Sequence, residues 1–299
     1  MPYIGRFAPS PTGPLHLGSL YTALASYLDA RANRGHWLLR IDDLDTPRIK
    51  KGSTASILKT LERFGLCWDG QIYYQSQHID VYEAALQRLL SGHLLYPCTC
   101  SRKQLSDHSQ TGNIYPGTCR LLSSEPTSAF ALRVKTNLQP ISFYDLLQGE
   151  IVRNLAQQDG DFIIKRKDQI IAYQLAVVID DQQQAISHVV RGLDLLYETP
   201  KQLYLQQKLG ITQPIYAHIP IVTDTLGQKL SKQSHAPAVK QDSPSAVLFK
   251  LLQWLKQSPP AVLKNSATHE ILSWAILNWK PNKLQGQQSI RTDSLPLDL

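Results

Sequence analysis

The chain has 299 residues, of which 42% are hydrophobic, and it carries a formal net charge of +7 with an isoelectric point of about 9.1. This length allows one large domain or two smaller ones, and the excess of positive charge suits a polyanionic partner such as RNA. No apolar run approaches the roughly 18–20 residues of a membrane span, and the N-terminus lacks the apolar core of a signal peptide. The four cysteines do not make a secreted disulfide framework. We therefore expect a cytoplasmic protein that does not associate with membranes.

The first predicted elements are a strand, a stiff loop and a helix. The apolar run Tyr3–Phe7 predicts a buried strand, and three prolines and a glycine in the next residues forbid regular structure. Helical periodicity then runs from Leu17 to Arg34. The helix N-terminus offers free backbone N–H groups, Gly18 allows close approach, and His16 can donate to a phosphoryl oxygen. We predict a phosphate site here; the alternative is a proline-rich connection with a surface histidine.

A second strand over Trp37–Ile41 completes a strand–helix–strand unit, which implies a parallel sheet with a right-handed crossover. Ligands of such sheets bind beyond the carboxyl ends of the strands. Both the proline-rich loop and the acidic stretch Asp42–Asp45 follow strands at that edge, so we expect them to converge on one cleft. Further helices are predicted over residues 53–64 and 79–90.

The middle of the chain has a different character. Cysteines, turn residues and short β patterns such as Phe130–Val134 fill residues 96–161, which predicts an insertion in the sheet domain. The apolar run Ile171–Ile179 is predicted to return to the main sheet. A strand is expected over Ala185–Val190 and ends at Arg191, and a helix is expected over Thr199–Leu209.

The last third begins with the apolar strand candidate Ile219–Val222, followed by a lysine-rich loop. Helical patterns cover Ala246–Leu255 and His269–Trp279. The polar tail from Lys280 is expected to be loosely ordered.

Three motifs carry a family resemblance: RFAPSPTGPLHLGS at residues 6–19, RIDDLD at 40–45 and KLSK at 229–232. In this order and at these distances they resemble the class I glutamyl-tRNA synthetases, over roughly the first 240 residues. Ser19 takes the fourth position of the "HIGH" signature, as suits the glutamyl branch. The resemblance implies an α/β fold with a class I synthetase Rossmann-like parallel sheet, a zinc-containing insertion and a small C-terminal helical domain.

The domain boundaries expected from this resemblance follow the changes in sequence character. The first half of the nucleotide-binding catalytic domain covers residues 1–92, and the zinc-containing insertion covers 93–170. The second half of the catalytic domain, with the KLSK loop, covers 171–235. A helical domain that contacts the tRNA stem, with a tail, covers 236–299.

Class I synthetases join an amino acid to ATP and then pass the acyl group to tRNA, so the protein mainly positions groups and stabilises charge on the phosphates. The resemblance assigns catalysis to His16, Gly18, Lys229 and Lys232, and ATP binding to His16, Gly18, Ser19 and Lys232. Magnesium is expected to arrive with ATP. The alternative for the two lysines is a solvated basic loop.

The resemblance also implies a glutamate pocket. It places Arg6 near the α-carboxylate and Arg191 near the side-chain carboxylate, with Tyr173 as a hydrogen-bond partner. Ala8 and Ser10 line the same pocket. Asp42 is expected to meet the ammonium group; the family normally has glutamate there, so the shorter side chain leaves a direct or a water-bridged contact open.

The insertion contains Cys98 and Cys100, and later Tyr115 and Cys119. Three thiolates and one further ligand would complete a tetrahedral zinc site. Among relatives of glutamyl-tRNA synthetase, the truncated paralogues that are known as glutamyl-Q tRNA(Asp) synthetases have a tyrosine as fourth ligand, which corresponds to Tyr115. We expect one structural zinc ion; His93 and His108 are competing ligands, and a cluster of small buried residues without metal is the alternative.

The length of the chain after the KLSK motif favours that truncated group. Only 67 residues follow Lys232, too few for the anticodon-binding domain of a full-length glutamyl-tRNA synthetase. The resemblance then implies a monomer that activates L-glutamate with ATP and transfers it to queuosine in the anticodon of tRNA(Asp). The alternatives are a tRNA(Glu) ligase with a reduced C-terminus and a catalytically inactive tRNA-binding protein.

Overall fold

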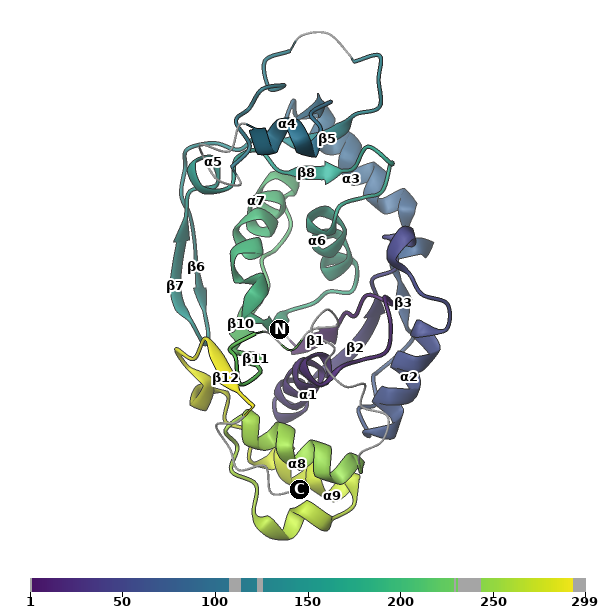
Figure 1. Cartoon of the computed structure of the whole chain (residues 1–299), viewed down its shortest axis with the longest axis vertical. Helices are drawn as coiled ribbons and strands as arrows, with labels where there is room; N and C mark the ends of the chain where they lie inside the picture. Colours follow the sequence, from purple (N-terminus) through teal and green to yellow (C-terminus); the bar gives the residue numbers. More distant parts are fainter. Residues whose placement is uncertain (1, 108–113, 123–125, 229, 231–242, 293–299) are drawn as a thin grey trace.

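A computed structural model describes residues 2–107, 114–122, 126–228, 230 and 243–292. Figure 1 shows two sheets in the middle of the molecule, the insertion at one end and a pair of C-terminal helices at the other. The helices of the described residues are α1 (Leu17–Ala32), α2 (Ser53–Arg63), α3 (Ile79–Ser91), α4 (Arg102–Asp107), α5 (Leu155–Gln158), α6 (Tyr173–Gln183), α7 (Thr199–Leu209), α8 (Pro244–Trp254) and α9 (Thr268–Leu277). The strands are β1 (Ile4–Phe7), β2 (His36–Ile41), β3 (Tyr73–Tyr74), β4 (Leu95–Cys98), β5 (Ala131–Val134), β6 (Ile141–Asp145), β7 (Gly149–Arg153), β8 (Ile163–Lys165), β9 (His188–Gly192), β10 (Ile215–Ile219), β11 (Ile221–Thr223) and β12 (Ser289–Arg291).

The predicted strand–helix–strand unit is confirmed. Strands β1, β2 and β3 pair in parallel in that order, with Ile4 opposite His36. A second sheet has the order β7-β6-β10-β9, in which β10 is parallel to both β6 and β9. The backbone N–H of Ser187 donates to the Ile4 carbonyl oxygen at 3.0 Å, so β9 begins beside β1. The carboxyl ends of β1 and β9 therefore meet at one edge.

The prediction that Ile171–Ile179 returns to the sheet is wrong, because these residues lead into helix α6, where every residue from Leu175 to Asp181 is buried. A short, mostly apolar run cannot be assigned to a strand or a helix from periodicity alone, and its four β-branched residues favoured the strand. The helix packs against α3 and α7. As a consequence, it carries Asp180 and Asp181 beneath the first sheet.

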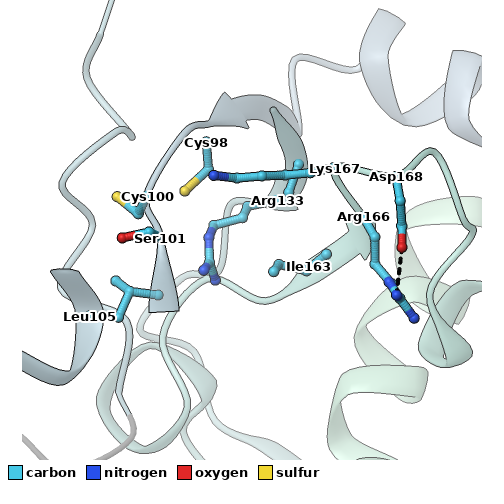
Figure 2. Close-up of a pocket in the computed structure, with 10 residues that line it drawn as sticks. Cys98, Cys100, Ser101, Leu105, Arg133, Ile163, Arg166, Lys167 and Asp168 are labelled. Carbon is cyan, nitrogen blue, oxygen red and sulfur yellow. Dashed lines mark hydrogen bonds and ion pairs between the residues drawn. The ribbon is translucent and has the colours of Figure 1, made fainter. Parts of the chain in front are cut away.

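The insertion is built on an antiparallel sheet, with β5 between β4 and β8. Cys98 is the last residue of β4, and Figure 2 shows it beside Cys100, with Arg133 of β5 lying between the cysteines and Ile163 of β8. Strands β6 and β7 form a hairpin that extends the second parallel sheet. The insertion thus stays attached to the strands that carry the site.

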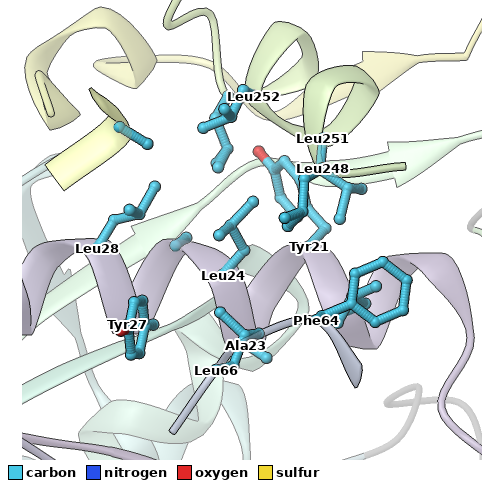
Figure 3. Packing of buried hydrophobic residues seen from close by; sticks show 14 of the residues in the cluster. Tyr21, Ala23, Leu24, Tyr27, Leu28, Phe64, Leu66, Leu248, Leu251 and Leu252 are labelled. Atoms are coloured by element: carbon cyan, nitrogen blue, oxygen red, sulfur yellow. The ribbon is translucent and has the colours of Figure 1, made fainter. Parts of the chain in front are cut away.

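The main core lies between α1 and the C-terminal helices. Figure 3 shows Tyr21 and Leu24 of α1 facing Leu248 and Leu251 of α8, and all four side chains are buried. Fully burying a leucine contributes about 1.5–3 kcal/mol, so this contact fixes the C-terminal helices to the catalytic half. Among the described residues, no helix has both the length and the apolar character needed to cross a membrane.

The expectation of a loosely ordered tail after Lys280 is wrong as far as residue 292. Strand β12 pairs in parallel with β11, and Ile290 lies opposite Val222. Leu284 and Ile290 are buried in the main core. These two buried residues were not evident from the mostly polar sequence. Strand β12, which contains Ile290, supports β11 before the KLSK motif.

Candidate functional site

A cleft of about 570 Å³ opens where β1 and β9 end and α1 begins. It is lined by both parallel strands, by the proline-rich loop and by the first turn of α1. Eight of the predicted site residues line it: Arg6, Ala8, Ser10, His16, Gly18, Ser19, Tyr173 and Arg191. Asp42 does not line it, and Lys229 and Lys232 lie outside the described residues.

His16 is the N-cap of α1. Its Nδ1 accepts a hydrogen bond from the Ser19 backbone N–H at 3.3 Å, and its Nε2 lies 2.9 Å from Ser19 Oγ. A neutral imidazole that accepts at Nδ1 carries its proton at Nε2. The Nε2–H then lies within hydrogen-bond distance of Ser19 Oγ, at the positive end of a helix, where a phosphate is favoured.

Gly18 is required by the close approach of another chain segment. A Cβ at this position would lie 2.9 Å from the Leu230 carbonyl oxygen. Leu230 is in turn held by a hydrogen bond of 2.8 Å from its backbone N–H to the Val222 carbonyl oxygen. Leu230, the described residue of the KLSK motif, therefore lies at the N-terminus of α1 and lines the cleft.

Arg6 belongs to a buried network of charges. Its Nε donates to Asp181 Oδ1 at 3.2 Å, and Arg40 NH1 donates to the same oxygen at 2.6 Å. Arg40 also contacts Asp42 at 2.8 Å and Asp180 at 3.6 Å. These two arginines and three carboxylates are all buried. If every group is ionised, the network has one negative charge in excess.

The excess negative charge bears on the pKa of Asp42. Burial raises the pKa of Asp42 to about 6, because the nearby Asp180 carboxylate adds to the effect and the Arg40 guanidinium only partly opposes it. Burial also raises the pKa of Asp180. The Asp42 backbone N–H donates to the Pro9 carbonyl oxygen at 3.1 Å, so the aspartate lies directly behind the proline-rich wall of the cleft. One more cation would balance this region.

Arg191, in contrast, has no carboxylate partner among the described residues, although its side chain is only 4% exposed. Its Nε donates to His218 Nε2 at 3.0 Å, and its NH2 donates to Thr199 Oγ1 at 2.8 Å and to Gln202 Oε1 at 2.9 Å. The NH1 group lies 3.5 Å from the hydroxyl of Tyr173, at the cleft. A buried, unbalanced guanidinium is costly unless an anion completes the site.

His218 connects Arg191 to a carboxylate. Its Nδ1 lies 2.6 Å from Asp145 Oδ2, and the imidazole is fully buried. Burial lowers the pKa of His218 to about 4; the bond to Asp145 opposes this, and the charge of Arg191 adds to it. Burial alone would raise the pKa of Asp145, but hydrogen bonds from His218 and from backbone N–H groups lower it. The pair is therefore a neutral imidazole beside an ionised carboxylate.

The three predicted cysteine ligands lie together. The sulfur atoms of Cys98, Cys100 and Cys119 are all within 4.8 Å of one another, and the last two are 3.5 Å apart. The hydroxyl oxygen of Tyr115 lies 3.4 Å from Cys98 Sγ and 3.8 Å from Cys100 Sγ. Tetrahedral zinc with bonds of about 2.3 Å holds neighbouring sulfurs about 3.7 Å apart. The donor set and its spacing fit a zinc ion.

The histidines considered as ligands do not join this cluster where the structure describes them. His93 is exposed in the turn before β4, and the cluster of candidate ligands found among the described residues contains cysteines only. His108 lies outside the described residues. The guanidinium of Arg133 lies 3.7 Å from the centre of the Tyr115 ring, a cation–π contact, while burial and the hydrogen bond to Cys98 raise the pKa of the Tyr115 hydroxyl.

Sequence reasoning missed the residues behind the two arginines. Asp180 and Asp181 directly follow an apolar run, and two acids at the end of such a run signal buried ion pairs. Asp145 falls on the inward face of β6, in register with Ile141 and Phe143. That alternation was readable in the sequence, but the partner of Asp145, His218, is 73 residues away.

Comparison with known proteins agrees with this geometry. Residues 4–273 match the family described as tRNA synthetases class I (E and Q), catalytic domain. A protein of Thiobacillus denitrificans named glutamyl-Q tRNA(Asp) synthetase is 50% identical over 279 residues, which span 92% of this chain and 93% of that protein. A protein of Pseudomonas fluorescens with the same name is 48% identical over 277 residues, which span 93% of this chain and 92% of that protein.

Solved structures show the same fold. The structure of a glutamate tRNA ligase from Elizabethkingia meningosepticum, in complex with its amino acid, matches with a TM-score of 0.80 and 26% identity. The match covers 98% of this chain and 67% of that ligase. The predicted class I synthetase fold is therefore confirmed.

Proposed function

The chain belongs to the class I synthetase family of glutamate and glutamine and, within it, to the glutamyl-Q tRNA(Asp) synthetases, and from this we propose that it activates L-glutamate with ATP and transfers the glutamyl group to queuosine in the anticodon of tRNA(Asp). The proposal includes a monomeric, cytoplasmic enzyme. The choice of glutamate rests on one observation. Arg191 is buried at the cleft and has no carboxylate partner among the described residues.

The charges around the cleft complement glutamate. At one end the guanidinium of Arg191 lacks an anion, and the γ-carboxylate of glutamate supplies one. At the other end the network of Arg6 and Asp42 has one negative charge in excess, and the α-ammonium supplies the cation. Glutamine would leave Arg191 unbalanced and place N–H against N–H, which is strongly unfavourable in a buried site.

The α-carboxylate of glutamate is itself the nucleophile, so the protein has no need of a catalytic serine or cysteine. We place it near Arg6, with Ala8 and Ser10 along the wall of the pocket. We place the ammonium near Asp42, through a bridging water, because the Asp42 carboxylate is already bonded to Arg40 behind the cleft wall. Tyr173, whose hydroxyl lies 3.5 Å from Arg191, borders the γ-carboxylate.

The first step forms glutamyl-adenylate. The glutamate α-carboxylate oxygen attacks the α-phosphorus of ATP, the new P–O bond forms, and the bond to the leaving pyrophosphate breaks. Negative charge on the phosphates is stabilised by the His16 Nε2–H and by the backbone around Gly18 and Ser19, at the N-terminus of α1. We propose Lys229 and Lys232 as the cations that complete this site, together with the magnesium that accompanies ATP.

The second step is ester formation. A hydroxyl of the queuosine cyclopentenediol attacks the acyl carbon, AMP leaves, and the hydroxyl proton is released. The diol resembles the ribose diol at a tRNA 3′ end, so the same ester-forming chemistry applies to queuosine. An unstacked base in an anticodon loop can enter a pocket, as single-stranded RNA commonly does.

Activation is tested by glutamate-dependent exchange of label between pyrophosphate and ATP. Exchange with glutamate, and at least about 100-fold less efficiently with glutamine, supports the proposal. Absence of exchange with every amino acid would favour an inactive tRNA-binding protein instead.

We further propose that Cys98, Cys100, Cys119 and Tyr115 bind one structural zinc ion. With four protein ligands the site is closed, and zinc there stabilises the insertion without taking part in the reaction. In the apo form the hydroxyl of Tyr115 and the backbone of Thr99 lower the pKa of Cys119 to about 7, although burial opposes this. One thiol of the set is therefore easily ionised.

The zinc prediction is tested by elemental analysis. The purified protein is expected to contain about one zinc per chain, and a Cys98→Ser variant to lose it, together with stability of the insertion. Tyr115→Phe is expected to retain zinc with lower affinity, because three thiolates remain. Full zinc affinity in Tyr115→Phe would remove the tyrosine from the ligand set, and a wild-type protein without zinc, whose thiols all react freely, would remove the site.

A further inference from the structure

We infer that His218 and Asp145 are positioning residues for the amino-acid pocket, because they hold the Arg191 guanidinium in place through a neutral imidazole and so leave its charge for the substrate carboxylate. The inference rests on the proposed function of Arg191. It assigns a role in substrate selection to two residues that lie behind the cleft wall, in β10 and at the end of β6.

The hydrogen bonds fix one tautomer of His218. Arg191 Nε can only donate, so His218 Nε2, at 3.0 Å, must accept. The imidazole proton is then on Nδ1, where Asp145 Oδ2 accepts it at 2.6 Å. Asp145 is itself held, because its Oδ1 accepts from the backbone N–H groups of Leu147 and Gln148. A protonated imidazole, or the other tautomer, would turn an N–H toward the guanidinium.

Arg191 and Arg6 differ in how they are held. Arg6 makes a direct ion pair with Asp181, which it shares with Arg40. Arg191 is held by an imidazole, a threonine hydroxyl and a glutamine amide, all uncharged, and the nearest anion behind it, Asp145, stands on the far side of the imidazole ring. A carboxylate in direct contact would satisfy the guanidinium and weaken its attraction for a second carboxylate. The intervening histidine orients the guanidinium without balancing it.

The surroundings of His218 keep this arrangement in place. The ring stacks on Tyr216 of the same strand, with ring centres 6.1 Å apart and an interplanar angle of 13°. Thr199 Oγ1, from α7, lies 3.2 Å from His218 Nε2. The charged groups that act on the ring are Asp145 from β6, Arg191 from β9 and Arg6 from β1.

Two substitutions separate the two bonds of this histidine. In His218→Asn the amide NH2 can replace the Nδ1–H toward Asp145, but no acceptor remains for Arg191. In His218→Gln the longer side chain can place its carbonyl oxygen where Nε2 lies. Gln206→Met is the matched control, since Gln206 is buried on α7, bonds Tyr216 and does not touch Arg191.

We expect His218→Asn to raise the KM for glutamate at least about tenfold in pyrophosphate exchange, with kcat and the KM for ATP near wild type, because a hydrogen bond to a charged group is lost. His218→Gln should recover most of this loss. Gln206→Met should lower the melting temperature without changing the KM for glutamate. Equal KM values in the Asn and Gln variants, or an unchanged KM in both, would overturn the inference.

The tautomer gives a second test that needs no variant. In the ¹⁵N NMR spectrum of the wild-type protein, His218 should show a protonated Nδ1 and an unprotonated Nε2 at neutral pH. A proton on Nε2 would overturn the inference even if His218→Asn fails to fold. If the wild-type protein shows no exchange with glutamate, the proposed function fails, and the tautomer still reports whether the contact with Arg191 exists.

Discussion

Lys232→Ala is expected to lower glutamate-dependent pyrophosphate exchange about 100- to 1000-fold, the usual effect of removing one group that stabilises developing charge in a transition state. The charge in this reaction develops on the phosphates as pyrophosphate leaves. Leu230, two residues before Lys232, lines the cleft and touches the N-terminal turn of α1 at Gly18. Leu230 of the motif therefore lies at the site where the phosphates are proposed to bind.

The measurement is steady-state exchange at saturating ATP and glutamate, with the melting temperature as a check on folding. Lys59→Ala is the matched control, because it removes one lysine charge from the exposed face of α2. The control should retain wild-type exchange. Near-normal exchange in Lys232→Ala would show that the second lysine of the motif does not act on ATP.

Arg191→Gln is expected to lower kcat/KM for glutamate about 100-fold or more, chiefly through KM. The reason is the loss of a charge-assisted contact between the buried guanidinium and the γ-carboxylate, which costs about 2–5 kcal/mol in comparable buried pairs. The glutamine side chain can still meet Thr199 or His218, so the fold is expected to survive.

Glutamate and glutamine are compared as substrates for this variant. The wild-type preference for glutamate should shrink, because the neutral pocket no longer penalises the amide. Arg34→Gln serves as control, since Arg34 is exposed just beyond the C-terminal end of α1. Unchanged glutamate kinetics in Arg191→Gln would mean that another residue recognises the side-chain carboxylate.

Part of the fold could be predicted from local sequence patterns. The strand, proline-rich loop and helix at the N-terminus follow from apolar spacing and from prolines, and helix α7 spans the predicted residues Thr199–Leu209. Helix α6 was missed because its buried faces leave no periodic signal. Strand β12 was missed because Ile290 is its only apolar residue, in a segment that is otherwise mostly polar.

Site residues that belong to a recognisable motif could be predicted from the sequence. The contacts that set the charge balance around those residues could not. Arg6 and Arg191 both end strands in the sequence and both line the cleft. Only the structure shows that one is paired with Asp181 and that the other is held by neutral groups. Such differences depend on contacts between residues far apart in the chain.

The cysteine cluster could likewise be predicted only in part from the sequence. The sequence offered three thiols, a tyrosine and two histidines, and the resemblance selected the tyrosine. The Tyr115 hydroxyl lies 3.4 Å from the Cys98 sulfur and 3.8 Å from the Cys100 sulfur, and the Cys100 and Cys119 sulfurs are 3.5 Å apart, which supports that choice. No spacing rule in the sequence would have placed a tyrosine hydroxyl there.

The central claim concerns the acceptor, and it is tested with tRNA(Asp) prepared from cells that can and cannot make queuosine. Transfer of labelled glutamate by the wild-type protein is measured on both preparations and on tRNA(Glu). We predict glutamylation of the tRNA(Asp) that carries queuosine, and no transfer above background to the other two. Equal transfer to both tRNA(Asp) preparations, or better transfer to tRNA(Glu), would contradict the account.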